Sequence, residues 1–139
     1  MTTRHLLDSS TLLYAVGEEH PLREPCHRWL TAATEGIVQL EASVEAGQEF
    51  LFHRMRRVGR AQAALEFEAL DGFLVWHAFD AQVLRRSAEL TVRCPIGGRD
   101  AVHAATALEA GFSEIVSADR DFESVPGLTL RHPTDLPGA

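Results

Sequence analysis

The sequence predicts an α/β fold in which helices flank a central, mainly parallel sheet of four or five strands. Short apolar segments alternate with longer segments of helical character, which is the pattern of parallel strands joined by helices. The chain has 139 residues, of which 45% are hydrophobic and 24% charged, enough for one globular domain and too few for two. We therefore expect a single domain over residues 1–139, with an irregular tail over residues 133–139, where two prolines and a glycine fall.

A strand and two helices are expected first. His5-Leu6-Leu7 is a short apolar run that ends at Asp8, so it predicts a buried strand with a carboxylate at its end. The hydroxyl residues Ser9-Ser10-Thr11 then start a helix. Beyond a loop, apolar side chains recur at helical spacing over residues 22–33, and Gly36 ends this second helix.

The middle of the chain continues the alternation of strands and helices. Residues 37–40 form the second expected strand, and Ser43 is placed to cap a helix that ends near Gly59. Residues 60–70 are rich in alanine and glutamate, which predicts another helix. A turn then leads to a third strand over residues 73–76.

The last third of the chain is organised around a helix of small residues. Asp80 is placed to cap a helix that runs to Leu90, and a proline and two glycines predict a loop over residues 92–98. The next helix carries Asp100 in its first turn, is rich in alanine, and is closed by Gly111, where left-handed dihedral angles are needed. Two further strands are expected over residues 114–117 and 128–130.

Composition restricts the classes of function. No apolar run approaches the roughly 20 residues of a membrane span, and no basic and apolar leader precedes Asp8, so we expect a cytoplasmic protein with no membrane partner. Cys26 and Cys94 lie far apart, which fits reduced thiols better than a disulfide framework or a metal knuckle. All 13 basic residues are arginine, so chemistry that depends on lysine is excluded.

The net charge of −7, taken alone, argues against nucleic acid as a partner, because proteins that bind phosphates usually carry a basic excess. The arginines nevertheless cluster, so a positive patch can coexist with a negative site, although runs of charge are more often solvated helix faces. The two clusters are Arg54, Arg56, Arg57 and Arg60, and Arg85, Arg86, Arg93 and Arg99.

Acidic residues are expected to meet at one edge of the sheet, where ligands bind in open parallel sheets. Asp8 closes the first strand, Asp119 follows the fourth, and Asp100 begins the small-residue helix. Glu45 and Glu49, one helical turn apart, follow the second strand. Two carboxylates about 4 Å apart repel by about 4 kcal/mol at an effective dielectric of about 20. Such a group would be partly protonated or would bind a divalent cation.

The type of ligand restricts the metal and the reaction. Oxygen ligands without a paired His or Cys set suit Mg²⁺ or Mn²⁺ rather than zinc. A magnesium ion held by carboxylates can activate water and neutralise charge on phosphorus, which is what phosphodiester hydrolysis requires. A lone aspartate at a strand end is more often a cap, so the prediction depends on several acids sharing one edge.

Four motifs follow one another at a specific spacing. They are Asp8-Ser9-Ser10, Ser43 with Gln48-Glu49-Phe50, Arg99-Asp100-Ala101-Val102-His103-Ala104-Ala105, and Ser117-Ala118-Asp119-Arg120-Asp121-Phe122. Together they resemble the PIN-domain ribonucleases and, more narrowly, the VapC-type toxins of bacterial toxin–antitoxin pairs. The resemblance runs from Leu6 to about Pro133. It implies a PIN-like three-layer sandwich and a metal-dependent endoribonuclease toxin that hydrolyses RNA, often tRNA or rRNA.

The resemblance also implies cofactor, partners and site residues. Mg²⁺ is the expected cofactor, with Mn²⁺ as a substitute. A cognate VapB-type antitoxin is expected to neutralise the toxin, in a homodimer or a toxin–antitoxin hetero-oligomer that meets DNA only through the antitoxin. The catalytic, metal-binding acids carried over are Asp8, Glu49, Asp100 and Asp119. The supporting residues are Ser10, Ser117, Asp121 and Arg99.

Several roles are left as alternatives at this point. Glu49 is preferred to Glu45 as the second acid, because the family's acid usually follows the serine by six residues. Asp121 is expected to hold its loop or to bind metal through water, and Arg99 to contact a substrate or a carboxylate of the antitoxin. His103 is interpreted as a partly buried helix histidine with a hydrogen-bond partner, outside the catalytic set.

Two other functions compete with the ribonuclease. A phosphatase or dehalogenase with Asp8 as nucleophile needs a second aspartate where Ser10 stands, and a lysine, so it is disfavoured. The stronger alternative is a catalytically inactive PIN-fold module that binds an arginine-bearing partner in its acidic cleft. Dependence on a divalent metal separates an enzyme from such a binding module. Trp29 and Trp76 are assigned to the core or an interface rather than to base stacking.

Overall fold

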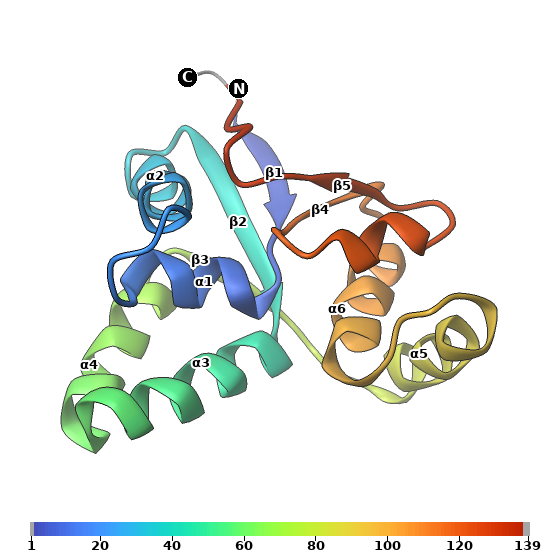
Figure 1. Cartoon of the computed structure of the whole chain (residues 1–139), viewed down its shortest axis with the longest axis horizontal. Helices are drawn as coiled ribbons and strands as arrows, with labels where there is room; N and C mark the ends of the chain where they lie inside the picture. The colour runs from blue at the N-terminus through green and yellow to red at the C-terminus, as the bar shows by residue number, and fades with distance from the viewer. Residues whose placement is uncertain (1, 138–139) are drawn as a thin grey trace.

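The computed structural model describes residues 2–137, and every strand pairing within them is parallel. β1 (Thr3–Leu6), β2 (Val38–Ser43) and β3 (Leu74–His77) form one sheet with β2 in the middle. β4 (Glu114–Val116) and β5 (Thr129–Arg131) form a second ribbon. A single parallel bridge from Leu7 to Val116 sets β4 beside β1, as Figure 1 shows. The strand order is therefore β3-β2-β1-β4-β5, in line with the predicted fold class.

β1 and β4 pair over a short stretch because the chain turns into a helix at this point. The backbone N–H of Asp8 still donates to the carbonyl of Val116, at 3.3 Å. Asp8 is also the N-cap of the next helix, so the chain leaves the sheet after one paired residue. β1 and β4 therefore separate next to Asp8, at the edge of the sheet where the candidate acids were expected.

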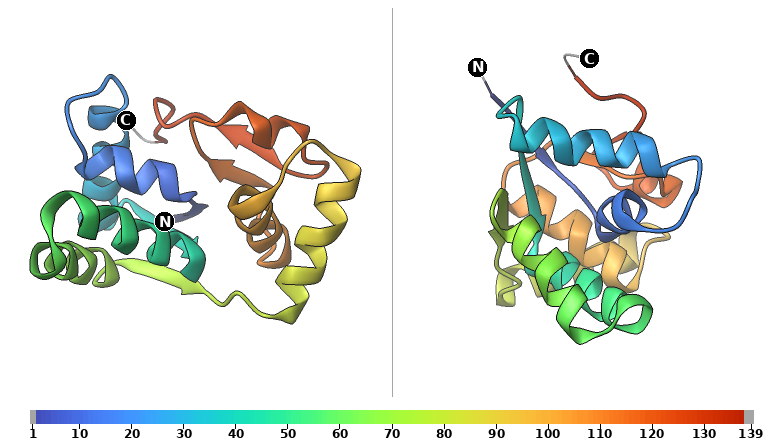
Figure 2. Two further views of the ribbon diagram at one scale, coloured as in Figure 1. Left: turned by 60° about the horizontal axis from the view of Figure 1, so that its bottom comes forward. Right: turned by 90° about the vertical axis from the view of Figure 1, so that its left-hand side faces the viewer.

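Helices cover both faces of the strands, which gives the expected three layers (Figures 1 and 2). One core cluster joins side chains of the first four helices to one face, and a second joins the last two helices and β4 to the other. The helices are α1 (Ser9–Val16), α2 (Arg23–Thr34), α3 (Val44–Val58), α4 (Arg60–Asp71), α5 (Ala81–Arg93) and α6 (Gly98–Glu109), with the 3-10 helix η1 (Arg120–Ser124) before β5.

The predicted helix boundaries are confirmed where a side chain makes the cap. Asp8, Ser43 and Asp80 each accept a hydrogen bond from a backbone N–H in the first turn of α1, α3 and α5. Gly111 follows α6 with a φ of +83°, the left-handed conformation that favours glycine. The alanines of α6 are buried, as expected of a helix that packs closely.

Three boundaries differ from the prediction by two residues or more. β2 continues to Ser43 because it is paired on both sides, to β1 and to β3. α5 continues to Arg93, because its backbone N–H groups still find carbonyls one turn back until Cys94. The loop predicted over residues 92–98 is therefore confined to 94–97. β1 begins at Thr3, two residues earlier than expected.

The two cysteines and the tail behave as expected within the described residues. Cys26 and Cys94 are free and buried. Residues 132–137 form turns, anchored where the indole N–H of Trp29 donates to the carbonyl of Pro133 at 2.8 Å. Trp76 stacks on Phe67. The last two residues of the predicted tail lie outside the described part of the chain. No helix between residues 2 and 137 combines the length and apolar character needed to cross a membrane.

Candidate metal centre

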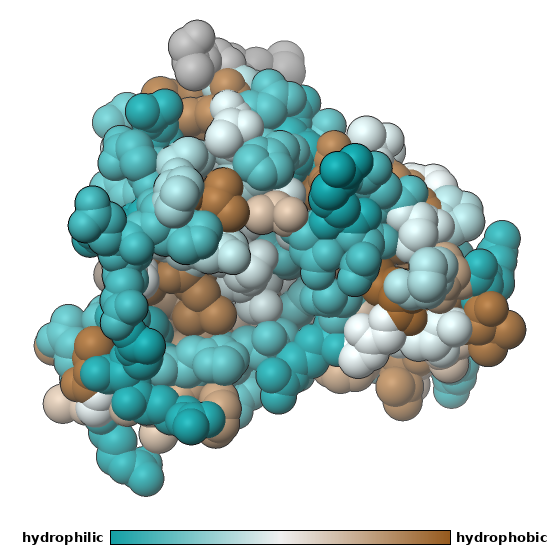
Figure 3. All heavy atoms as spheres, in the orientation of Figure 1, coloured by the Kyte–Doolittle hydropathy of each residue, from teal (hydrophilic) through white to brown (hydrophobic). Residues whose placement is uncertain are grey.

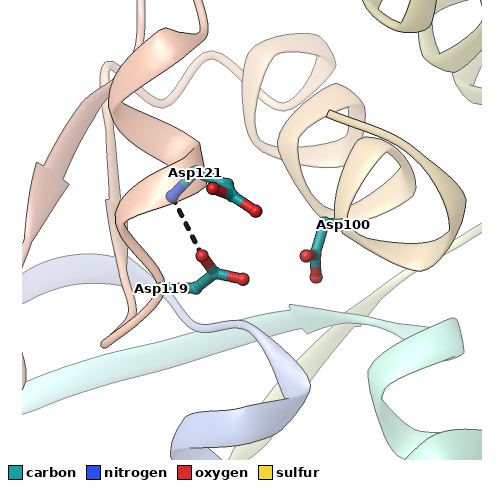
Figure 4. Close-up of side chains that lie close together, drawn as sticks. All are labelled: Asp100, Asp119 and Asp121. Carbon is teal, nitrogen blue, oxygen red and sulfur yellow. Dashed lines mark hydrogen bonds between the residues drawn. The ribbon is translucent and has the colours of Figure 1, made fainter. Parts of the chain in front are cut away.

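Three aspartates converge at the carboxyl edge of the strands (Figure 4). Asp100 projects from the first turn of α6, Asp119 caps η1, and Asp121 lies in the first turn of η1. One carboxylate oxygen from each lies within 4.8 Å of the other two. The backbone N–H of Asp121 donates to Asp119 Oδ1 at 2.9 Å, which fixes this pair in one loop opposite Asp100. Among the described residues, this is a group of carboxylates that could hold a metal ion.

The electrostatics of this group favour an added cation. Burial, the hydrogen-bonding contact with Asp119 and the negative charges of Asp119 and Asp8 raise the pKa of Asp100 to about 6. The charge of His103 opposes this rise only in part. The aspartates lack enough positive charge of their own, so a divalent cation would relieve their repulsion.

Asp8 lies behind this group and is almost fully enclosed by donors. It is 2% exposed. Its Oδ1 accepts from the N–H and the hydroxyl of Thr11, and its Oδ2 accepts from the hydroxyls of Ser10 and Ser117, both at 2.7 Å. Ser117 Oγ in turn accepts from the backbone N–H of Asp119 at 3.0 Å. Four donors match the four lone-pair positions of a carboxylate, and Ser117 connects Asp8 to the loop of Asp119.

Glu49 stands apart from the three aspartates and has partners of its own. It is 9% exposed, and it accepts hydrogen bonds from His103 Nε2 at 3.0 Å and from Ser9 Oγ at 3.1 Å. Arg99 Nη1 lies 3.7 Å from it, and Arg99 Nε lies 3.4 Å from Glu45. Burial alone would raise the pKa of Glu49, but the hydrogen bonds from His103 and Ser9, with the charges of His103 and Arg99, hold it below its usual value.

The expected site residues therefore fall into connected groups rather than one ring. Asp100 and Asp119 come together as expected, and Asp121, expected only in a supporting role, joins them. Asp8 reaches them through Ser117. Glu49 lies with His103 and Arg99, so Arg99 contacts carboxylates of its own chain.

Three residues of this network escaped the sequence analysis or were set aside. Ser9 and Thr11 were treated only as helix starters. His103 was expected to be partly buried with a partner; it is fully buried, and its partner is a candidate catalytic acid. Its position three residues after Asp100 was the available signal, because such residues share a helix face.

A groove begins at the hydroxyl that supports Asp8. Its volume is about 470 Å³, and it lies between α1 and α3. Figure 3 shows apolar side chains in the hollow between these helices, on a face that is otherwise largely hydrophilic. The lining residues include Ser10, Tyr14, His53, Arg54 and Arg57.

Two arginines in each of the two predicted clusters are paired with acids of the same chain. Arg54 is paired with Glu66 at 2.6 Å, and Arg57 contacts Glu18. In the second cluster, Arg86 is paired with Glu109 and Arg99 with two glutamates. These arginines neutralise acids of the same chain, because the helices that carry them also carry or face glutamates.

The sequence and the structure of the chain are similar to those of known proteins. The family model described as PIN domain matches residues 5–128. Ribonuclease VapC7 of Mycobacterium tuberculosis is 34% identical over 120 residues, covering 84% of this chain and 83% of that protein. Ribonuclease VapC13 of the same species is 31% identical over 134 residues, covering 88% and 95%. The solved structure of VapBC2 from Rickettsia felis bound to a promoter DNA fragment matches with a TM-score of 0.74 at 18% identity, covering 93% of this chain and 98% of that one.

Proposed function

The chain belongs to the PIN-domain family and, within it, to the VapC ribonucleases, and on that basis we propose that it is a metal-dependent endoribonuclease. Its substrate would be RNA, of the tRNA or rRNA class, cut by hydrolysis of a phosphodiester bond. The observation that carries the proposal is the convergence of Asp100, Asp119 and Asp121 at the open edge of a parallel sheet, with Asp8 behind them.

The donor set fits Mg²⁺, or Mn²⁺ in its place. All the candidate ligands are carboxylate oxygens. Burial and the nearby charges of Asp119 and Asp8 raise the pKa of Asp100, and a divalent cation would neutralise those charges. Asp100, Asp119 and Asp121 would hold the ion, with Asp8 and Glu49 completing the acidic surroundings. When bound, the ion would activate water and neutralise charge on the phosphate.

The acidic side chains around the proposed metal site have different roles. Burial and the acidic neighbours of Asp100 favour its protonated form, and Asp100 would lose this proton when a cation is bound at the site. Asp8 holds the start of α1 and, through Ser117, the loop of Asp119 in a fixed relation. Among the four donors to Asp8, the Ser10 hydroxyl is only part-buried, so it is the donor that can be displaced if Asp8 binds the ion directly. Glu49 stays ionised between His103 and Arg99.

The proposed partner is a VapB-type antitoxin, in a toxin–antitoxin hetero-oligomer or with a toxin homodimer at its centre. Support comes from the relatives named VapC and from structurally similar proteins, among them the promoter-bound VapBC2 of Rickettsia felis and the DNA-bound VapBC of Salmonella typhimurium. An arginine of such a partner would be attracted by the aspartates. DNA would be contacted only through the antitoxin.

The test is cleavage of total RNA by the purified protein with Mn²⁺, with EDTA as control. Wild type should cut, and both EDTA and Asp100→Asn should reduce the rate at least about 100-fold, since even residues that only support metal ligands are worth 10- to 100-fold. Failure to cut, with no Mn²⁺ binding by calorimetry, would favour the alternative of an inactive PIN-fold module that binds an arginine-bearing partner.

A further inference from the structure

Glu49 is fixed by two residues that come from the elements carrying the candidate aspartates. Its Oε1 accepts from His103 Nε2 at 3.0 Å, and its Oε2 accepts from Ser9 Oγ at 3.1 Å. Ser9 directly follows Asp8, and His103 lies one turn after Asp100 on α6. The carboxylate carried by α3 is therefore tied to both α1 and α6.

His103 occupies a position where stability alone does not explain a histidine. Its side chain is fully buried, and its Nδ1 has no hydrogen-bond partner among the residues that the structure describes. A buried polar atom without a partner disfavours the folded state relative to an apolar side chain of similar size. The polar contact that the buried ring does make is to Glu49, with the Ser9 hydroxyl 3.5 Å away.

The other charged groups around Glu49 are less permanent partners. Arg99 is 57% exposed, lies 3.7 Å from Glu49 Oε2, and is shared with Glu45. An exposed arginine can turn to solvent or to a phosphate at little cost, whereas a buried imidazole cannot leave. His103 and Ser9 therefore set the orientation of Glu49 whether or not Arg99 stays.

We propose that His103 is a positioning residue, whose Nε2–H fixes the orientation of the Glu49 carboxylate beside the metal site. This inference rests on the proposed function, in which Glu49 belongs to the acidic surroundings of the metal. The Nδ1 atom has no part in it. The proposal therefore requires a hydrogen-bond donor to Glu49 at the position of Nε2, and a donor nearer the backbone would not reach the carboxylate.

Two amide variants separate these positions. His103→Gln places an N–H at about the reach of Nε2, whereas His103→Asn places its amide near Nδ1 and falls short of Glu49. Mn²⁺ affinity is measured by titration calorimetry on the metal-free protein, and folding is checked by melting in EDTA. His103→Gln should bind within about threefold of wild type, and His103→Asn about 10-fold or more weaker, the usual loss when a residue supporting a metal ligand is removed.

A double-mutant cycle with Glu49 tests whether His103 affects Mn²⁺ binding through Glu49. In a Glu49→Gln background, His103→Asn should weaken Mn²⁺ binding no further. If the Asn variant does not fold, His103→Leu replaces it, because leucine fills the ring's space without a donor. This variant should melt lower than wild type, since Glu49 loses a buried partner, and below its melting temperature it should bind Mn²⁺ about 10-fold more weakly.

Three results would overturn the proposal: wild-type affinity without a donor at residue 103, equal losses with Gln and Asn, or an undiminished loss when Glu49 is already replaced. Failure of the proposed function looks different, because the wild type itself would neither bind Mn²⁺ nor cleave RNA, and the role of His103 would fall with it.

Discussion

Glu41 and the aspartates at the sheet edge belong to the same fold, yet the negative charge of Glu41 is balanced by its neighbours and that of the aspartates is not. Glu41, on the middle strand β2, is 1% exposed and accepts hydrogen bonds from Arg4, Gln39 and His77 at 2.6–2.9 Å. Burial alone would raise its pKa, but these donors and the charge of Arg4 outweigh it and lower the pKa to about 2. At the sheet edge, the pKa of Asp100 rises to about 6.

Burial raises the pKa of both Glu41 and Asp100, so the opposite outcome comes from their neighbours. Glu41 has a guanidinium and an imidazole from its own chain, so its charge is balanced within the fold. Asp100 faces Asp119 and Asp121, so the balance has to come from outside. A buried acid with its own cation is part of the scaffold, whereas partly exposed acids that face each other mark a candidate site. Three predictions test this contrast.

The largest effect is expected at Glu41. Glu41→Gln leaves Arg4 and His77 without a negative partner, and it should lower the free energy of unfolding by about 2 kcal/mol; losses for fully buried pairs are larger, but Arg4 is 53% exposed and can turn to water. Urea denaturation in EDTA at pH 7 measures this. RNA cleavage at permissive temperature should stay near that of wild type.

The matched control is Glu24→Gln, which removes an exposed pair with Arg28 and should cost under about 0.5 kcal/mol. Equal stability of the Glu41 and Glu24 variants would remove the distinction between a balanced buried acid and a surface acid.

A smaller change of opposite sign is expected at the sheet edge. Asp100→Asn removes one charge from a group of like charges, so the metal-free protein should be more stable by about 1 kcal/mol. Wild type should gain about 1.4 kcal/mol from Mn²⁺ at ten times its dissociation constant, and the variant much less. Denaturation with Mn²⁺ and with EDTA compares the two.

The exposed Asp135→Asn variant should behave as wild type in both conditions. Destabilisation of the metal-free protein by Asp100→Asn would mean that the aspartates are held together by contacts that outweigh their repulsion.

The smallest effect is the pH dependence of the metal-free protein. The pKa of Asp100 is raised from 3.8 to about 6, so its contribution favours folding at low pH and is lost as the pH rises across that interval. The pKa of Glu41 is lowered from 4.5 to about 2, so its contribution is complete above pH 4.5 and is lost as the pH falls toward 2. For the partly exposed Asp100 we expect on the order of 1 kcal/mol.

Urea denaturation in EDTA between pH 3 and pH 7.5 should therefore show opposite slopes on the two sides of about pH 4.5. Asp100→Asn should flatten the upper side and Glu41→Gln the lower side. A profile in which either variant flattens both sides would show that the two groups titrate together and are not separate regions.

Much of the fold followed from the sequence because its signals are local. The caps at Asp8, Ser43 and Asp80 each involve residues two or three positions apart. Those at Ser43 and Asp80 were predicted, whereas the start of α1 had been assigned to the hydroxyl residues that follow Asp8. The apolar runs and helical periodicities placed the strands and helices within a few residues. The errors came where pairing across the sheet or continued helical hydrogen bonding extended an element, at the ends of β2 and α5.

The candidate site was predictable only in outline. The positions of Asp8, Asp100 and Asp119 after strands or at a helix start indicated a shared edge. The place of Asp121 in the group of three depends on the turn of η1, which the sequence did not show. The sequence analysis did not single out Glu41, because no neighbouring residue in the sequence indicates that Arg4 and His77 contact it in the fold.

By itself, therefore, the sequence determined the order of elements, the family and the edge at which acids gather, since these depend on neighbouring residues and on motifs of fixed spacing. Only the tertiary structure decided which acids are balanced and which are not. Glu49 meets His103 across 54 residues, and Asp8 meets Ser117 across 109. The charge state of a buried carboxylate is set by the groups within a few ångströms of it, and those groups are brought together only when the strands and helices pack.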